Sequence, residues 1–327
     1  MQTFSTISEI KTIDAGCVLT IGNFDGVHQG HQQILKAAKR AAAERGAKLL
    51  AMTFEPHPLA IVRPEKAPGT LTPLPLKERL IGEFGADYLF VAQSTPELLA
   101  LSAEQFIQLF LCESVRPSLV VEGESFKFGS GRSGSVHTLA ESAKINGFDV
   151  SVVKAGRVQL LSGQSVEVSS TIIRNLLAEG SVADAATALG RPYRLIGRII
   201  PGRGKGRRLG FPTANMKLPK QVIPAEGVYA GYAVIADSLD KLLSDLKKTP
   251  AALSIGKSPT YGDTETVLIE AHLLEKNIPD LYGKQIAMDF IKKIRPQKKF
   301  KTESALADQI AKDCKQAKAI LAACEAH

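Results

Sequence analysis

The stretch TIGNFDGVHQGHQQIL, residues 20–35, joins an apolar run to a segment with helical spacing. Gly22 and Gly30 permit a tight turn and a close approach of the backbone to a ligand. Parallel sheets bind ligands at the carboxyl ends of their strands, where the N-terminus of the next helix favours a phosphate. His28 and His31 would add ring N–H donors for the same anion. We therefore expect a phosphate-binding strand–turn–helix unit; the alternative is a helix cap with two incidental surface histidines.

The first half of the chain alternates in the same way. Helical spacing covers residues 30–45, and the apolar runs that indicate strands are residues 17–22, 48–54, 87–92, 118–123 and 148–153. Strands that alternate with helices predict a parallel sheet with helices on both faces. We expect an α/β domain over residues 1–186.

The second half has a different period. Short alternating segments appear, separated by Gly, Pro and polar turns: RLIGRII, GVYAGYAVIA, AALSIG, TVLIEAHLL and KQIAMDFI. This pattern predicts a small antiparallel β-barrel over residues 187–327, and helical spacing predicts a final helix over residues 304–326. We place the domain boundary near residue 186, after a run of small residues.

Composition limits the class of protein and its cellular compartment. The chain has 327 residues, 44% of them hydrophobic and 23% charged, as in soluble globular proteins of two domains. No apolar run approaches a bilayer span, the start does not resemble a signal peptide, and the four cysteines lack zinc-finger spacing. We expect a cytoplasmic protein with reduced thiols and no membrane partner.

The net charge of +8 is unevenly distributed. Residues 1–186 hold 17 Lys and Arg against 19 Asp and Glu, whereas residues 187–327 hold 24 against 14. A basic half suits phosphorylated small molecules or nucleic acid, or is simply a solvated surface. Because the chain has no Trp and only 6% aromatic residues, base-stacking platforms are scarce, and we expect no nucleic-acid partner.

A second candidate phosphate site is VSSTIIRNLLAEG, residues 168–180. Ser169, Ser170 and Thr171 open a helix, and Arg174 follows one turn later. Hydroxyls at a helix N-terminus together with an arginine suit a phosphate. On its own, the stretch indicates no more than a well-capped helix.

The third candidate is GRGKGRRLGFPTAN, residues 202–215. It is not a dinucleotide fingerprint, because Arg207 stands where the third glycine belongs. AALSIGKSP does not complete a P-loop either, since Ala251 replaces its first glycine. The stretch does offer backbone donors, cations for phosphates and, in Thr213 and Asn215, two neutral oxygen ligands that suit Mg²⁺. The alternative is a basic hairpin loop.

Taken in order, GNFDGVHQGHQQIL, TFEPHP, FKFGSGRSG and VSSTIIRNLLAEG resemble the bacterial bifunctional riboflavin kinase/FMN adenylyltransferase (FAD synthetase) family. GFPTAN, GVYAG, IEAHLL and DLYGK resemble its riboflavin kinase module, and the resemblance covers nearly the whole chain. It implies a Rossmann-like nucleotidyltransferase domain followed by an antiparallel barrel. It also implies phosphorylation of riboflavin to FMN by ATP with Mg²⁺, then transfer of AMP from ATP to FMN, which gives FAD and pyrophosphate.

The resemblance assigns roles in the first domain. His28 and His31 would be catalytic. The ATP-binding set would be Gly22, Asn23, Phe24, Gly30, Ser169, Ser170, Thr171 and Arg174. The flavin-binding set would be Ser125, Phe126, Phe128 and Arg132.

The resemblance also assigns roles in the second domain. Glu270 would be the general base, and Thr213 and Asn215 the Mg²⁺ ligands. The flavin would contact Phe211 and Arg295. The nucleotide-binding set would be Gly202, Gly204, Lys205, Gly206, Arg207, Arg208, Thr213 and Asn215.

Three positions depart from the family pattern, which has Asp or Asn at Ser125, commonly Asn at Ser254 and often Glu at Gln297. The leading hypothesis is an enzyme with both activities. The alternatives are an enzyme in which one activity has decayed and a nucleic-acid-binding or regulatory protein built on these folds. The oligomeric state stays open.

Overall fold

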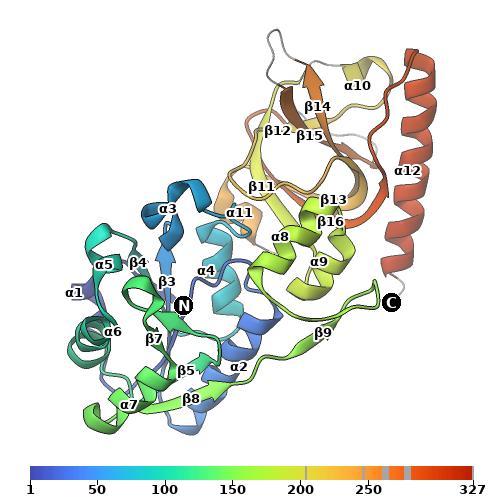
Figure 1. Cartoon of the computed structure of the whole chain (residues 1–327). Coiled ribbons are helices and arrows are strands. Elements are labelled where there is room, and N and C mark those ends of the chain that lie inside the picture. Colours follow the sequence, from blue (N-terminus) through green and yellow to red (C-terminus); the bar gives the residue numbers. More distant parts are fainter. Residues whose placement is uncertain (203–204, 245–246, 260–264, 276–280, 326–327) are drawn as a thin grey trace. The chain divides into compact units, whose positions relative to one another are not determined.

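The computed structural model describes residues 1–202, 205–244, 247–259, 265–275 and 281–325 (Figure 1). The chain forms two compact units. The first comprises Met1–Arg157 and Glu167–Ser169, and the second comprises Val158–Val166 and Ser170–His327.

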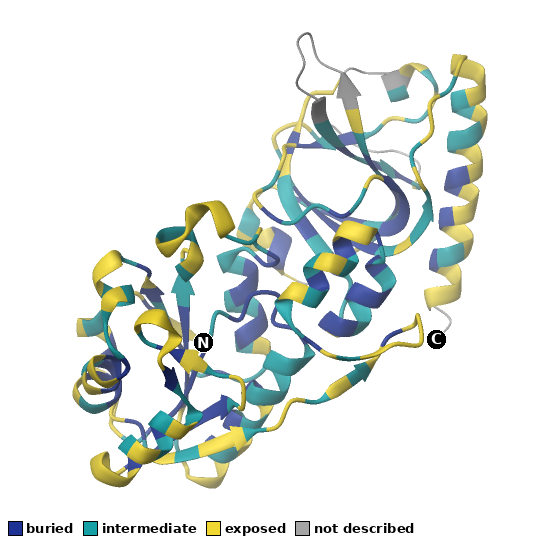
Figure 2. Cartoon of the chain, viewed as in Figure 1, coloured by how far each residue is buried: buried dark blue, intermediate teal, exposed yellow. Residues whose placement is uncertain are grey.

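The first unit is built on the predicted parallel sheet. Its strand order is β1-β4-β3-β2-β5-β8, and every neighbouring pair is parallel. The central strands are buried on both faces, which explains why they appear in the sequence as continuous apolar runs (Figure 2). The strands are β1 (Gln2–Phe4), β2 (Val18–Ile21), β3 (Leu49–Glu55), β4 (Tyr88–Gln93), β5 (Leu119–Gly123) and β8 (Asp149–Val153).

Helices and a small hairpin complete this unit. β6 (Lys127–Phe128) pairs with β7 (Gly134–Ser135). The helices are α1 (Ile7–Ile10), α2 (Gln29–Glu44), α3 (Pro58–Val62), η1 (Pro64–Lys66), α4 (Leu74–Glu83), α5 (Pro96–Ala100), α6 (Ala103–Phe106), the π-helix η2 (Ile107–Val115), η3 (Ser130–Arg132) and α7 (Val136–Asn146).

The strand order reverses beside β2. From this strand the chain continues to β3 and β4 on one side, whereas β5 and β8 lie on the other. The β2–α2 turn therefore leaves the sheet at its topological switch point, where open α/β sheets bind ligands. The apolar face of α2 holds it there, since Leu35, Ala38 and Ala42 are fully buried.

The second unit contains the predicted barrel. Its strands close in the order β11-β12-β15-β14-β13-β16, and all neighbouring pairs are antiparallel. The strands are β11 (Tyr193–Ile200), β12 (Ala214–Met216), β13 (Gly227–Ala236), β14 (Thr249–Pro259), β15 (Glu265–Leu273) and β16 (Gln285–Arg295). The helices are α8 (Ser170–Glu179), α9 (Val182–Leu189), α10 (Lys205–Arg208), α11 (Leu239–Leu243) and α12 (Glu303–Glu325). A separate hairpin pairs β9 (Arg157–Gln159) with β10 (Ser165–Glu167).

Alternation along β15 divides its side chains between two faces. Ile269, Ala271 and Leu273 are buried in the barrel, whereas Glu270 and His272 are half-buried on its outer face. Helix α12 packs on this outer surface, because Ala252 of β14 shares an apolar cluster with Cys314, Ala317 and Leu321.

The expected domain boundary after residue 186 falls inside α9. Ala185 and Ala188 of this helix are fully buried, and α9 packs against β16. The preceding helix α8 is also tied to the second unit, where the Ala225 N–H donates to the Leu177 carbonyl at 2.9 Å.

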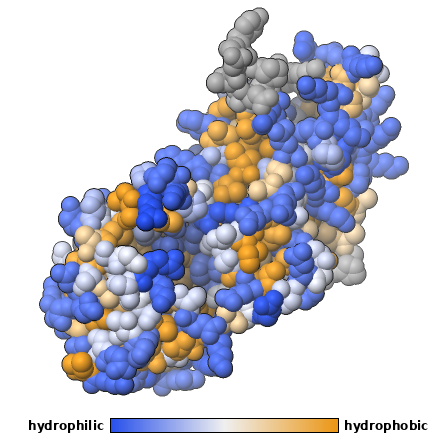
Figure 3. Space-filling model, in the orientation of Figure 1, coloured by the Kyte–Doolittle hydropathy of each residue, from blue (hydrophilic) through white to orange (hydrophobic). Residues whose placement is uncertain are grey.

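Within the described ranges, no helix is both long and apolar enough to cross a membrane. Figure 3 shows hydrophilic side chains over much of the visible face, with apolar side chains gathered in smaller areas.

Candidate functional sites

The turn after β2 has an unusual backbone. Phe24, Val27 and Gly26 have positive φ angles of 46°, 39° and 90°. Two of these are bulky residues for which this region is costly, so the surrounding packing must hold the turn. Phe24 provides part of that packing, because its ring is only 1% exposed.

The turn brings His28 and His31 together at the start of α2. His28 is the N-cap residue, and its Nδ1 accepts a hydrogen bond from the His31 N–H at 3.4 Å. The two rings stack with centroids 3.6 Å apart, and Phe24 meets His31 edge-on at 5.3 Å. The two predicted histidines thus form one cluster at a helix N-terminus.

Gly30 is closely surrounded. An added Cβ would lie 3.3 Å from the His28 ring and 3.4 Å from the carbonyl oxygen of Val168. The histidine turn therefore adjoins the residue that precedes Ser169. Ser170, Thr171 and Arg174 belong to α8 in the second unit, and their grouping with the histidines stays a prediction.

Asn23 contacts a histidine that the sequence analysis did not single out. Its Nδ2 lies 3.3 Å from Nε2 of His57, and its carbonyl accepts from Thr53 Oγ1 at 3.1 Å. Nearby, Asp25 accepts hydrogen bonds from the N–H groups of Leu71 and Thr72, both at 3.0 Å. His57 lies in the quoted TFEPHP segment, so the sequence did contain a signal for it.

A buried carboxyl group also supports this end of the sheet. Glu122 of β5 is 2% exposed, and its Oε1 accepts from the Ile21 N–H at 2.5 Å. Regular pairing of β2 with β5 covers only Val18 and Leu19, so this side chain joins the strands beyond their ladder. Burial raises the pKa of Glu122 well above its ordinary value, although the hydrogen bond from Ile21 opposes the shift. The sequence analysis did not anticipate that Glu122 lies on the strand next to the switch point.

The predicted flavin-binding residues of this unit occupy different environments. Ser125 and Arg132 are exposed. Phe126 is half-buried and stacks on Phe128 at 5.4 Å, and Phe128 itself packs against Phe106 at 5.5 Å within the core. Phe126 is therefore the more accessible ring, and Phe128 supports it from behind.

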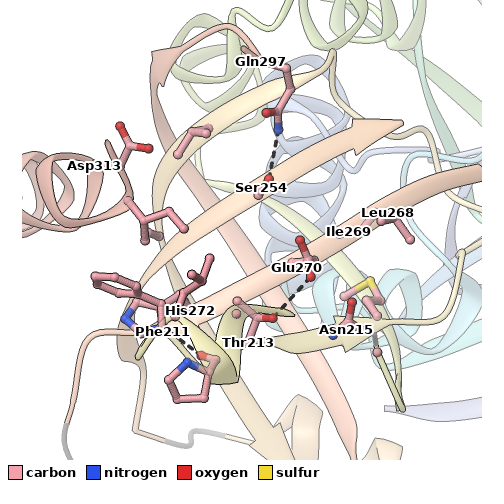
Figure 4. Close-up of a pocket in the computed structure, with 18 of the residues that line it drawn as sticks. Phe211, Thr213, Asn215, Ser254, Leu268, Ile269, Glu270, His272, Gln297 and Asp313 are labelled. Carbon is pink, nitrogen blue, oxygen red and sulfur yellow. Dashed lines mark hydrogen bonds between the residues drawn. The ribbon is translucent and has the colours of Figure 1, made fainter. Parts of the chain in front are cut away.

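The second unit contains a cavity of about 960 Å³ on the outer face of the barrel (Figure 4). Strands β12, β15 and β14 supply one wall, and the segment after β16 together with the start of α12 supplies another. The predicted residues Thr213, Asn215, Glu270 and Arg295 all line it.

Glu270 is the central acidic group of this cavity. Its Oε1 accepts a hydrogen bond from Thr213 Oγ1 at 3.2 Å, and Asn215 stands directly opposite it on β12. Burial raises the pKa of Glu270, and the hydrogen bond from Thr213 opposes that shift. A partly desolvated carboxylate with a raised pKa is a stronger base than an exposed one.

The glycine-rich loop approaches the same group of residues. A Cβ on Gly202 would lie only 2.2 Å from Asn215 Nδ2, so any other residue there would displace the Asn215 side chain. Gly206 lines the cavity, and Arg208 is exposed. Gly204 and the side chains of Lys205 and Arg207 lie outside the described part of the chain.

The two predicted flavin contacts of the kinase have protein partners. Arg295 pairs with Asp313 of α12 through Nε–Oδ1 at 2.9 Å and Nη2–Oδ2 at 2.7 Å. Phe211 meets His272 edge-on at 5.5 Å, and His272 Nδ1 lies 2.8 Å from the Pro212 carbonyl oxygen. The Arg295–Asp313 pair fixes the segment after β16 to α12.

Ser254 and Gln297, two of the three departures from the family pattern, contact each other. Gln297 Nε2 donates to Ser254 Oγ at 2.9 Å. Residues 43 positions apart thus form one donor–acceptor pair in the cavity wall.

Comparison with known proteins matches each half of the chain to a family. The FAD synthetase family profile matches residues 10–172, and the riboflavin kinase profile matches residues 189–321. The bifunctional riboflavin kinase/FMN adenylyltransferase of Escherichia coli K12 is 38% identical over 298 residues, which cover 91% of this chain and 90% of that protein. The enzyme of Pseudomonas fluorescens is 34% identical over the full length of both chains.

Among solved structures, a Streptococcus pneumoniae protein described as a macrolide-efflux protein has a TM-score of 0.84 at 26% identity. The match covers 97% of this chain and 99% of that protein. Both profiles and the near full-length identities point to the same assignment. The chain belongs to the bifunctional riboflavin kinase/FMN adenylyltransferase family.

Proposed function

We propose that the two reactions of this bifunctional enzyme take place at the two sites described above. The chain phosphorylates riboflavin to FMN and adenylylates FMN to FAD, with ATP as the second substrate of each step. The barrel cavity would carry out the first step, and the β2–α2 turn would bind ATP for the second.

In the kinase step, Glu270 would be the general base. It would take the proton from the ribityl 5′-hydroxyl while that oxygen attacks the γ-phosphorus of ATP. The new O–P bond forms as the bond to the β–γ bridging oxygen breaks, and ADP leaves. The observation that carries this role is the placement of a half-buried carboxylate with a raised pKa beside Thr213 in the cavity.

Thr213 and Asn215 fit a magnesium site that is completed by substrate. They offer neutral oxygens on the same wall as Glu270, and Mg²⁺ typically takes few protein ligands besides phosphate oxygens. The described residues contain no cluster of three or more His, Cys, Asp or Glu that would hold a metal without substrate. Bound Mg²⁺ would neutralise phosphate charge.

In the adenylyltransferase step, the triphosphate of ATP would lie at the N-terminus of α2. The stacked His28 and His31, with Asn23 beside His57, offer side-chain donors there, and Gly22, Phe24 and Gly30 shape the turn. Donors aimed at phosphate oxygens stabilise the charge that develops as AMP is transferred and pyrophosphate leaves. Ser169, Ser170, Thr171 and Arg174 remain sequence-based candidates for the same ligand, and Phe126 is the best-placed candidate for the flavin.

The test uses the full chain and two substrates. Glu270→Gln keeps the shape of the side chain but cannot accept the proton, so FMN formation from riboflavin should fall about 10²–10⁴-fold. FAD formation from added FMN should continue in the same preparation. Unchanged FMN turnover in the Gln variant would exclude the base role.

We also propose a cytoplasmic location. All four cysteines are free in the structure, and Cys17 and Cys314 are buried.

A further inference from the structure

Ser254 lies beside the proposed base. In the β14–β15 ladder it is directly opposite Glu270, and both residues line the cavity on the outer face of the barrel. Side chains directly opposite each other in an antiparallel pair have Cβ atoms about 5 Å apart. Figure 4 shows Ser254 between Gln297 and Glu270.

The amide of Gln297 is fixed by the barrel. Its Nε2 donates to Ser254 Oγ at 2.9 Å and to the Ile255 carbonyl at 2.9 Å, with the Gly227 carbonyl further away at 3.4 Å. A primary amide has two N–H hydrogens, so the two shorter bonds use both of its donors. A glutamate at this position would face the Ile255 carbonyl with an acceptor instead, which disfavours it here.

The contact with Gln297 determines whether the Ser254 hydroxyl serves as hydrogen-bond donor or acceptor within the cavity. Among the described residues, Gln297 is its hydrogen-bond partner, and the hydroxyl accepts that bond. Its own proton must point away from the Gln297 N–H and is available to an acceptor in the cavity. Glu270 accepts from Thr213 on the same wall, and within the described ranges no hydrogen bond joins it to Ser254.

We propose that the Ser254 hydroxyl donates a hydrogen bond to the ribityl chain of riboflavin, and that Gln297 is the positioning residue that orients it. The assignment rests on the proposed kinase role of this cavity, because the 5′-hydroxyl that Glu270 deprotonates brings the ribityl chain to this wall. The departures from the family pattern at residues 254 and 297 then act together in binding riboflavin, and neither is a separate loss of function.

The proposal predicts a specific loss of flavin affinity. In the full chain, Ser254→Ala should raise the KM and the dissociation constant for riboflavin about five- to tenfold, as expected for one hydrogen bond, and leave the KM for ATP unchanged. Ser254→Thr keeps the hydroxyl and should stay within about twofold of the parent. Gln297→Met keeps the length of the side chain but has no donor, so it should reproduce the Ser254→Ala effect. Lys299→Ala, an exposed neighbour outside the cavity lining, is the matched control.

Two further measurements distinguish positioning from a general structural effect. The double variant Ser254→Ala/Gln297→Met should bind riboflavin no more than about twofold more weakly than Ser254→Ala, because both changes remove the same contact. The affinity of the parent and of Ser254→Ala is also compared for riboflavin analogues that lack the 2′-, 3′- or 4′-hydroxyl. Ser254→Ala should bind two of these analogues more weakly than the parent does. The analogue that lacks the accepting hydroxyl should bind equally well to both proteins. Thermal unfolding of each variant identifies a loss caused by misfolding.

Three results would overturn the proposal. The first is a Ser254→Ala loss of affinity that is equal for all three analogues. The second is a raised KM for ATP in Ser254→Ala. The third is a shift of the acid limb of the kinase pH profile in that variant, which would mean that Ser254 acts through Glu270. Riboflavin affinity is also measured without ATP in the Glu270→Gln background. If Ser254→Ala still weakens riboflavin binding in that background, the role of Ser254 is supported even if Glu270 proves not to be the base.

Discussion

Thr213→Val tests whether Thr213 tunes the base. Its hydroxyl donates to Glu270 Oε1 at 3.2 Å, a bond that favours the charged form of the carboxylate. Hydrogen bonds to charged groups contribute about 1.5–3 kcal/mol, and this long one belongs near the lower end. Losing about 1.5 kcal/mol changes a protonation equilibrium about tenfold. The pKa of Glu270 should therefore rise further in the variant.

The sign of the effect on rate follows from the role of the base. Glu270 must be deprotonated to act, so a higher pKa moves the acid limb of kcat/KM for riboflavin to higher pH. On that limb, the variant should be about tenfold slower than the parent. The assay follows FMN formation against pH at saturating Mg²⁺, so that weaker metal binding does not imitate the shift.

Thr213→Ser is the matched control, because it keeps the hydroxyl and should keep the limb in place. A uniform loss of activity at every pH, with no movement of the limb, would refute the tuning argument. Thr213 would then act only on the metal or the phosphates.

The remaining predictions concern the first unit and the boundary. His28→Ala and His31→Ala should each lower FAD formation from FMN about 10²–10³-fold and leave FMN formation intact, whereas equal loss of both activities would make the histidines structural. Because burial raises the pKa of Glu122, its contribution to stability is present at low pH and lost as the pH rises through the folded-state pKa. Glu122→Gln carries no titratable group, so its Tm relative to the parent should rise between acid and alkaline pH. The same difference in Tm between variant and parent at acid and at alkaline pH would contradict this. A fragment of residues 170–327, which keeps α8 and α9, should phosphorylate riboflavin, and a fragment of residues 187–327 should do so with a lower Tm; a folded 170–327 fragment that forms no FMN would refute the kinase assignment.

The sequence predicted the alternation of both units because burial leaves a periodic signal. Residues 17–22 and 48–54 became β2 and β3, and the five segments of the second half became barrel strands. It did not indicate β1, a strand of three residues paired only at the sheet edge. The small residues taken for a boundary form α9, because alanines such as Ala185 and Ala188 let a helix pack closely on β16.

The candidate sites were predictable where motif and contact coincide. His28 and His31 are three residues apart on one turn, so their stacking follows from local geometry. The contact between Ser254 and Gln297 joins residues 43 positions apart, and it depends on how the segment after β16 returns across β14. No periodicity in the sequence encodes that return, which is why the two positions first looked like independent departures.

Side chains along strand β15 alternate between two environments with a period of two residues. Odd-numbered positions from Ile269 to Leu273 fill the barrel, and the even-numbered Glu270 and His272 face the cavity. Substitution at an even position can therefore alter chemistry with little effect on the core. A single-residue insertion before Glu270 would exchange the two sets, burying a carboxylate in the barrel and removing it from the cavity. The even-numbered positions of this strand should tolerate changes of residue far better than the strand tolerates changes of length.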